Sequence, residues 1–176
     1  MTRYVGLSDD KLPHGWGEMD YQTGSSYSGH WAQGMRDGCG VMVSPGTLST
    51  RFTGQWQRDR MTGWGEMRYS NGAVYRGQWV DNMYHGRGGL TWASGDAYTG
   101  AWSMGLMHGR GEYTYSDGAR WGERGVGERY HDFTSRYEGQ WSNGLSTGDG
   151  LMKTATGVCL DIIWEMQQPI SYIAKC

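Results

Sequence analysis

The sequence predicts an all-β fold, namely an elongated single-layer antiparallel sheet made of consecutive β-hairpins of 23 residues each. Glycine supplies 31 of the 176 residues, far above the roughly 7% that proteins average. Ten Trp and twelve Tyr take the place of aliphatic residues, so the core is expected to consist of aromatic rings packed on bare backbone. The third observation is an internal repeat, which indicates an array of stacked structural units.

The repeat is the pattern Tyr-x-Gly-x-Trp, seen most clearly at Tyr75, Gly77 and Trp79. Copies start at residues 4, 27, 52, 75, 98 and 137; the first has Ser8 in place of Trp, and the third begins with Phe52. A Gly-x-Gly pair follows eleven and thirteen residues after each start: Gly15/Gly17, Gly38/Gly40, Gly63/Gly65, Gly86/Gly88, Gly109/Gly111 and Gly148/Gly150. This register accounts for 26 of the 31 glycines, so the pattern is not a chance one.

Each repeat is predicted to form one hairpin, because both of its segments alternate between apolar and polar residues as a strand with one buried face does. Residues 75–80 show this alternation, and a polar loop over residues 80–87 is expected to precede the second strand. Three-residue links that end in Gly join successive hairpins, at 70–72, 93–95 and 116–118. Within a hairpin we expect Trp79 to lie opposite Gly88, so that each bulky residue covers a glycine.

The array is expected to cover residues 4–159 and to be followed by a segment of different character at 160–176. Counting 23 residues on from Tyr98 reaches Trp121, where the pattern breaks, and the next intact copy starts 16 residues later. Residues 121–136 are therefore interpreted as a decayed repeat that forms a bend or a protruding loop. In the last segment, Leu160, Ile162 and Trp164 form a degenerate, apolar copy.

The pattern resembles MORN repeats (membrane occupation and recognition nexus), with six copies in register over residues 4–157. Asp59 and Asn82 stand where a loop glycine is frequent in such repeats. The resemblance implies a twisted single-layer sheet with a groove along one face. It also implies a scaffold in a ciliary, cytoskeletal or signalling assembly, and lipid head-group binding has been attributed to the same family.

Charge and composition exclude several other classes. The net charge of −2 offers no basic field for nucleic acid, no apolar run is long enough to span a membrane, and the first ten residues lack the apolar part of a secretion signal. Three cysteines without metal-like spacing indicate a reduced, cytoplasmic chain. His14, His85 and His108 share one repeat position but would lie roughly 9.6 Å apart, too far to share a metal ion. We expect no enzyme activity, metal or cofactor, because the Gly-rich fragments lack the helix that a phosphate cradle needs.

The candidate site is the aromatic stripe formed by the first and last residues of each Tyr-x-Gly-x-Trp copy. Its members are Tyr27, Trp31, Phe52, Trp56, Tyr75, Trp79, Tyr98, Trp102, Tyr137 and Trp141. The rings either serve only to cover glycines or, because one layer leaves a face uncovered, also form a partner-binding groove for an extended or helical segment. Trp16 and Trp64 are expected on the opposite face. Charged residues beside the stripe, such as Glu66, Arg68, Glu112 and Glu138, are expected mainly to be solvated.

The C-terminal segment offers a second candidate site. It is predicted either to cap the open edge of the sheet or to dock a partner or a second copy, through Ile162, Ile163, Trp164, Ile170 and Ile173. From these observations we expect a non-catalytic scaffold or adaptor that binds other proteins in a ciliary, axonemal or other cytoskeletal assembly. The alternative is a peripheral membrane module that binds phosphoinositides, against which the acidic net charge counts.

Overall fold

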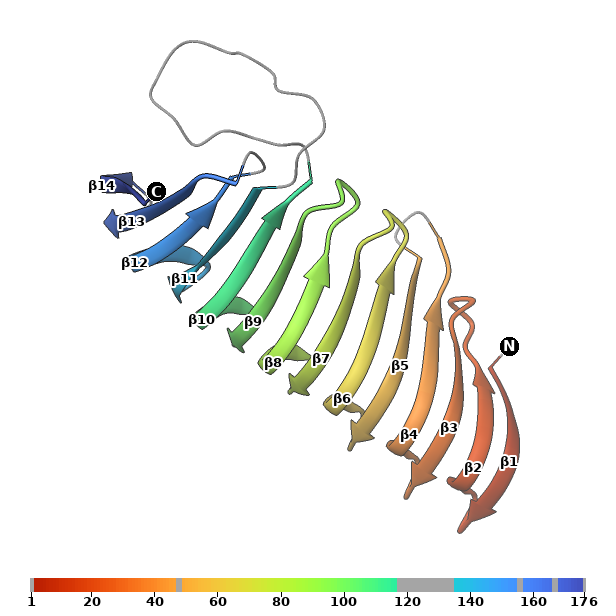
Figure 1. Ribbon diagram of the computed structural model, residues 1–176. Helices are drawn as coiled ribbons and strands as arrows, with labels where there is room; N and C mark the ends of the chain where they lie inside the picture. Colours follow the sequence, from red (N-terminus) through yellow and green to blue (C-terminus); the bar gives the residue numbers. More distant parts are fainter. Residues whose placement is uncertain (1, 47–48, 117–134, 155–156, 166–167, 176) are drawn as a thin grey trace. The chain divides into compact units, whose positions relative to one another are not determined.

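The computed structural model describes residues 2–46, 49–116, 135–154, 157–165 and 168–175. In these residues, fourteen strands form a sheet whose order follows the chain from β1 to β14 (Figure 1). Within each of the two compact units of the chain described below, neighbouring strands pair in antiparallel fashion, as β5 does with β6 and β11 with β12. The predicted all-β, single-layer antiparallel sheet of consecutive hairpins is confirmed.

The chain forms two compact units, Met1–Gly86 and Arg87–Cys176. The strands of the first unit are β1 (Arg3–Asp9), β2 (Leu12–Asp20), β3 (Ser26–Ala32), β4 (Met35–Ser44), β5 (Thr50–Gln57), β6 (Arg60–Tyr69) and β7 (Val74–Val80). Strand β8 (Met83–Thr91) begins in the first unit and ends in the second. The second unit continues with β9 (Ala97–Ser103), β10 (Leu106–Tyr115), β11 (Ser135–Ser142), β12 (Leu145–Lys153), β13 (Cys159–Glu165) and β14 (Gln168–Lys175).

Two-residue turns connect the strands within the six hairpins from β1–β2 to β11–β12. Both central residues have positive φ, for example 49° at Asp81 and 66° at Asn82, which is the type I′ turn that matches the twist of the flanking strands. The polar loop predicted over residues 80–87 is wrong, because β8 already starts at Met83. The three-residue links are confirmed at 70–72 and 93–95, where Gly72 and Gly95 have φ of 90° and 93° and close the turn by donating to the Tyr69 and Trp92 carbonyls. The link at 116–118 and the decayed repeat over 121–136 lie largely outside the described residues.

A row of glycines crosses the strands of each unit. Within hairpins, Gly29 pairs with Gly40 and Gly54 with Gly65, and between hairpins Gly40 pairs with Gly54. The row comprises Gly6, Gly17, Gly29, Gly40, Gly54, Gly65 and Gly77 in the first unit and Gly100, Gly111, Gly139 and Gly150 in the second. The predicted hairpin register, with Trp opposite the second glycine, is therefore wrong by two residues. The aromatic ring that covers the glycines comes from the Tyr position of the repeat.

The two glycines of each Gly-x-Gly pair have different roles. The first, such as Gly63 with φ of 58°, sits where the hairpin register shifts between Gly54 and Gln55, and a glycine in the left-handed region is what such a β-bulge requires. The second provides space, since a Cβ on Gly40 would lie 2.2 Å from the Tyr27 hydroxyl. Each tyrosine ring thus lies flat on two facing glycines.

Candidate functional site

The ten residues of the aromatic stripe are buried. Tyr75 and Tyr98 have no exposed surface, and the most exposed member, Trp141, retains only 7%. The structure brings these side chains together on one face of each unit, as their alternation along the strands predicts. Their burial makes the stripe the hydrophobic core of the protein.

Edge-to-face contacts join the rings into a ladder. In the first unit, ring centroids lie 5.0 Å apart from Tyr27 to Trp31, 5.5 Å from Tyr27 to Trp56, and 5.2 Å from Phe52 to both Trp56 and Trp79. In the second unit, Tyr98 contacts Trp102 and Trp141 at 5.1 and 5.3 Å, and Tyr137 contacts Trp141 and Trp164 at 5.7 Å. Each such pair adds about 0.5–1.5 kcal/mol beyond the area that it buries. Successive repeats are therefore joined through side chains as well as through backbone hydrogen bonds.

The polar atoms of the rings bond to the backbone of the repeat. The indole N–H of Trp31 donates to the Gly17 carbonyl at 3.2 Å, and Trp102 donates to Gly88 at 3.0 Å. The hydroxyl of Tyr75 donates to the Gln78 carbonyl three residues later at 3.0 Å. Trp56 Nε1 is buried and has no hydrogen-bond partner within the described part of the chain. These bonds fix the ring orientation, which sequence periodicity alone does not specify.

A second row of side chains lies beside the stripe tryptophans. It consists of the residue nine positions after each start from residue 27 onward, and the structure leaves each of its members half-buried: Arg36, Met61, Tyr84, Met107 and Ser146. Four of them pair directly with a stripe tryptophan, as Met61 does with Trp56. We call these five residues the cover row. The expectation that the single-layer sheet leaves ring surface of the stripe accessible is wrong, because the rings pack on glycine, on each other and under this row. Partner binding along this face stays a prediction.

Arg36 is the most constrained member of the cover row. Its guanidinium lies 4.2 Å from the ring centroid of Trp56 in the next hairpin, and its Nε pairs with Asp59 Oδ1 at 2.8 Å. Cation–π contacts of this kind contribute on the order of 1 kcal/mol. Sequence analysis missed Arg36; the available signal was its repeat position, which Met or Tyr occupies in the next three copies.

Tyr84 is the aromatic member of the cover row. Its ring stacks on Tyr75 with centroids 3.7 Å apart, and its hydroxyl meets that of Tyr69. Desolvation by burial raises the pKa of Tyr84, and the hydrogen bond with Tyr69 raises it further. Burial likewise raises the pKa of Tyr98 and of Tyr137 to about 12. The tyrosines of this face therefore remain protonated throughout the physiological range.

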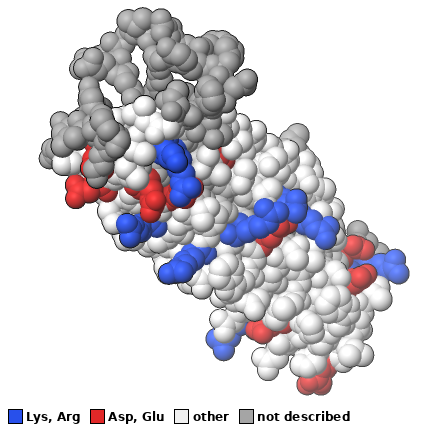
Figure 2. Space-filling model, in the orientation of Figure 1, with Lys and Arg blue, Asp and Glu red and all other residues white. Residues whose placement is uncertain are grey.

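The opposite face carries the predicted Trp16 and Trp64, which are 53% and 58% exposed. Trp64 shares this face of β6 with Glu66 and Arg68, and Glu66 also stands opposite Arg76 on β7. Figure 2 shows basic side chains gathered with acidic ones over the strands that Figure 1 labels β5–β7. The prediction that these charges are simply solvated is only partly right, because Glu66 forms ion pairs with both arginines, at 2.5 and 2.6 Å.

The C-terminal segment forms β13 and β14, which pair with each other and continue the sheet from β12. Ile162 stands in the glycine row opposite Gly150 and is buried, as is Trp164, at 4% each. Ile163 points to the other face and is 41% exposed. Ile170 and Ile173 lie in β14, and their side chains fall outside the described part of the structure.

The part of the chain that the structure describes lacks two further features. No cluster of three or more metal-ligating side chains occurs among them. They also contain no helix with the length and apolar character needed to cross a membrane.

Comparison with known proteins agrees with this geometry. The family model of the MORN repeat matches residues 27–46, 52–74, 75–97, 98–120 and 137–158, which together exceed half of the chain. The chain belongs to the MORN repeat family. The repeat that starts at residue 4 is not among the matched segments, although its Tyr4 ring covers Gly6 and Gly17 as the other copies do.

A curated relative contains a similar segment. The chain is 35% identical over 60 residues to a protein of Plasmodium berghei (strain Anka) described as "Inactive protein tyrosine kinase pTKL". This match covers 34% of the chain and 4% of that much longer protein. It shows a similar segment within a much longer protein.

Proposed function

We propose that this protein is a non-catalytic scaffold or adaptor that binds other proteins along the aromatic-lined face of its sheet. The observation that carries the proposal is that the stripe rings are buried while a half-buried cover row lies beside them. A face built in this way offers one accessible side chain per hairpin at intervals of roughly 9.6 Å, which suits a long segment better than a small molecule.

The cover row, and not the stripe itself, supplies the contact surface in this proposal. In the first unit Met61 and Tyr84 offer apolar or aromatic atoms, and in the second unit Met107 does the same by itself; methionine adapts its shape to different partners. The stripe rings beneath them hold these side chains in place. An extended or helical segment lying along the row would be anchored at intervals by its own apolar side chains.

For the setting, we propose a ciliary, axonemal or other cytoskeletal assembly in the cytoplasm. Support comes from membership of a repeat family whose members are similar in serving as scaffolds. The repetitive architecture also supports it, because contacts repeated along an array add up to a strong total interaction even when each is weak.

The experiment compares two variants of the tagged protein purified from its source cells. Met61→Gln/Tyr84→Gln changes the cover row, and Trp64→Ala changes the opposite face as a matched control. We expect mass spectrometry to identify proteins that the wild type and the control retain and the cover-row variant loses. Equal recovery with folded forms of all three proteins would contradict the proposal.

A peripheral membrane module that binds phosphoinositides is the alternative. Exposed arginines on the opposite face favour it, because each basic residue near an anionic membrane contributes about 1 kcal/mol, while the net charge of −2 opposes it. Sedimentation with vesicles that contain or lack phosphoinositide separates the two functions. Salt-sensitive pelleting that depends on phosphoinositide would favour the membrane module.

A further inference from the structure

The face opposite the stripe carries an unusual group of arginines in the first unit. Arg51 and Arg68 pair directly across β5 and β6, and Arg76 follows on β7, all with exposed side chains. Like charges directly opposite each other destabilise a sheet. Arg51 forms no ion pair with any residue that the structure describes. Arg68 and Arg76 each pair with Glu66, so Arg51 is the arginine whose charge is left for a ligand to compensate.

Glu66 positions two of these arginines for such a ligand. Its two carboxylate oxygens bind the Nε atoms of Arg68 and Arg76. Desolvation opposes the effect, but these two hydrogen bonds keep the pKa of Glu66 below its ordinary value. Each guanidinium is held through Nε, and its Nη nitrogens form no hydrogen bond with a residue that the structure describes. A guanidinium fork of this kind binds a carboxylate through paired hydrogen bonds.

Trp64 lies on the same face of β6, four residues before Arg68. Its ring is 58% exposed, and its backbone N–H donates to the side-chain oxygen of Gln55 at 3.1 Å. Gln78 stands directly opposite Trp64 on β7. The middle of this surface is therefore apolar and rimmed by amide groups, which can both donate and accept hydrogen bonds.

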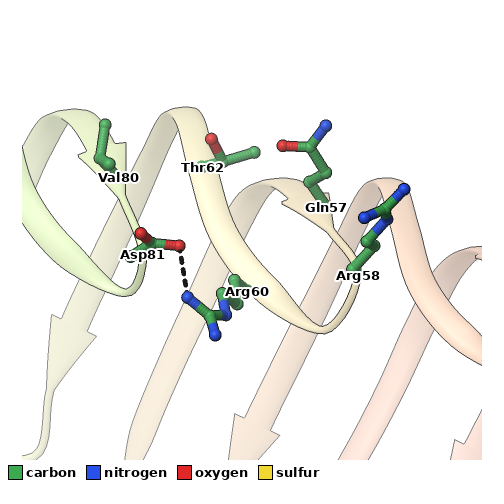
Figure 3. Close-up of a pocket in the computed structure, with 6 residues that line it drawn as sticks. All are labelled: Gln57, Arg58, Arg60, Thr62, Val80 and Asp81. Atoms are coloured by element: carbon green, nitrogen blue, oxygen red, sulfur yellow. Dashed lines mark hydrogen bonds and ion pairs between the residues drawn. The ribbon is translucent and has the colours of Figure 1, made fainter.

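A hollow with a cavity volume of about 590 Å³ lies at the turn end of the same strands. Figure 3 shows its lining: Gln57, Arg58, Arg60, Thr62, Val80 and Asp81. Arg60 pairs with Asp81 at 2.8 Å, but both side chains are more than half exposed, so this pair contributes little stability and exchanges readily. Arg58 adds a second guanidinium at the rim. From Arg60 to Arg68 the strand spans roughly 25 Å, the length of about eight extended residues.

We propose that this surface, from the hollow at Arg58 and Arg60 across Trp64 to Arg51, Arg68 and Arg76, binds an extended acidic segment of a partner protein. We call it the Arg–Trp track. The segment carries carboxylates at both ends, facing the two arginine groups, and an apolar side chain in its middle that contacts Trp64. It lies on the face opposite the cover row, so it adds a second binding surface to the function proposed above.

The distribution of charge favours a protein segment over nucleic acid. A polynucleotide carries a phosphate at every step, whereas the arginines cluster at the two ends and Glu66 lies between Trp64 and Arg68. Proteins that bind single strands also stack successive bases on several rings. Trp64 is the one aromatic ring of the track. Separated acidic groups with an apolar residue between them match this surface.

Trp16 provides a matched internal control. It occupies the same repeat position as Trp64, on the same face, and is similarly exposed. Its strand continues with Glu18 and Asp20 where that of Trp64 continues with Glu66 and Arg68. The His30 ring packs edge-to-face against it with centroids 5.3 Å apart. Trp16 therefore has the ring without counterparts of Arg68 and Arg76, and Arg3, the counterpart of Arg51, stands opposite Asp20.

The test measures fluorescence anisotropy of a labelled acidic peptide of about eight residues, with leucine at its centre and aspartate or glutamate on both sides. The full chain is titrated at low and at physiological salt, and the control peptide has the corresponding amides. We expect binding of the acidic peptide and not of the amide control. Trp64→Ala and Arg68→Glu/Arg76→Glu should each weaken binding by roughly tenfold or more, while Trp16→Ala should leave it unchanged.

Competitors identify the class of ligand. An unlabelled oligonucleotide or vesicles containing anionic lipid should displace the peptide poorly. If either competitor binds more tightly than the peptide, and if that binding depends on Trp64, the proposal is overturned. It is also overturned if the acidic peptide fails to bind, or if Trp16→Ala and Trp64→Ala weaken binding equally. Circular dichroism checks that each variant is folded, which both exposed tryptophan substitutions should be. Cover-row variants should bind the peptide normally, so this test is independent of the function proposed above.

Discussion

Trp56 and Trp64 lie on the two adjoining strands of one hairpin, yet their surroundings are opposite. Trp56 is 5% exposed and Trp64 is 58% exposed. The difference comes from the face on which each side chain stands. Trp56 packs between aromatic rings of neighbouring repeats, whereas the direct neighbour of Trp64 across the strand pair is Gln78. The comparison teaches that, in a one-layer sheet, a core forms wherever every hairpin repeats a ring on the same face.

The largest expected effect tests the energetic side of this comparison. Trp79 is 2% exposed and contacts Phe52, Tyr75 and Tyr84. The substitution Trp79→Ala should therefore lower the free energy of unfolding by roughly 3–5 kcal/mol. Trp64→Ala should change it by no more than about 0.5 kcal/mol. Urea denaturation of both variants measures the difference. Similar losses in the two variants would mean that the exposed ring also belongs to the core.

The next effect concerns the glycines beneath the rings. Gly40→Ala places a Cβ against the buried Tyr27 ring, at 2.2 Å from its hydroxyl, and the ring has no free space into which to move. We expect a loss of roughly 1–3 kcal/mol in the free energy of unfolding. Gly89→Ala is the control, because its Cβ would meet no ring, only the Thr99 hydroxyl at 3.3 Å and the Tyr98 carbonyl oxygen at 3.6 Å. If both substitutions cost the same, the glycine row is not required for ring packing.

The repeat itself made most of the fold predictable from the sequence. A step of 23 residues, extended by two between the starts at 27 and 52, and a two-residue alternation predicted the strands, the buried face and the links ending in Gly72 and Gly95. The hairpin register was wrong because both a Trp–Gly and a Gly–Gly pairing satisfy the same alternation. The two registers differ in the bulge at the first glycine of each pair, which the Gly–Gly register requires. The positive φ of Gly63 is the evidence for this bulge.

The candidate site was predictable in membership but not in accessibility. The sequence identified the ten stripe residues, but it contained no direct signal that Met61 and Tyr84 would pack beside them. That arrangement follows from type I′ turns at Arg58–Asp59 and Asp81–Asn82, whose residues lack the usual turn glycine. The cation–π contact of Arg36 with Trp56 joins neighbouring repeats, so a pattern within one repeat could not show it.

A pH titration sharpens the contrast between the two faces. Because burial raises the pKa of Tyr98 and Tyr137 from 10 to about 12, the folded protein retains protons that the unfolded chain releases above pH 10. The resulting stabilisation is complete below pH 10 and is lost as the pH rises through 12. We therefore expect the free energy of unfolding to fall steeply between these values. Tyr98→Phe/Tyr137→Phe should show a shallower fall, and an unchanged slope would contradict the assignment.

The smallest expected effect concerns the repeat that has Phe52, which carries no hydroxyl, at the stripe position that Tyr occupies in the other copies. Tyr27, Tyr75 and Tyr98 each donate to the carbonyl three residues later, at 3.0–3.1 Å, and Phe52 occupies the equivalent position before Gln55.

Phe52→Tyr should therefore form the same bond with the Gln55 carbonyl and raise the free energy of unfolding by about 0.5–1 kcal/mol. Tyr75→Phe, which removes this bond, should lower it by a similar amount. Urea denaturation of both variants provides the measurement. A destabilised Phe52→Tyr with a destabilised Tyr75→Phe would show that the ring of Phe52 sits too close to Gly54 and Gly65 to admit the oxygen. In that case the space above the two glycines of this repeat accommodates Phe but not Tyr, and Phe and Tyr cannot replace each other at every stripe position.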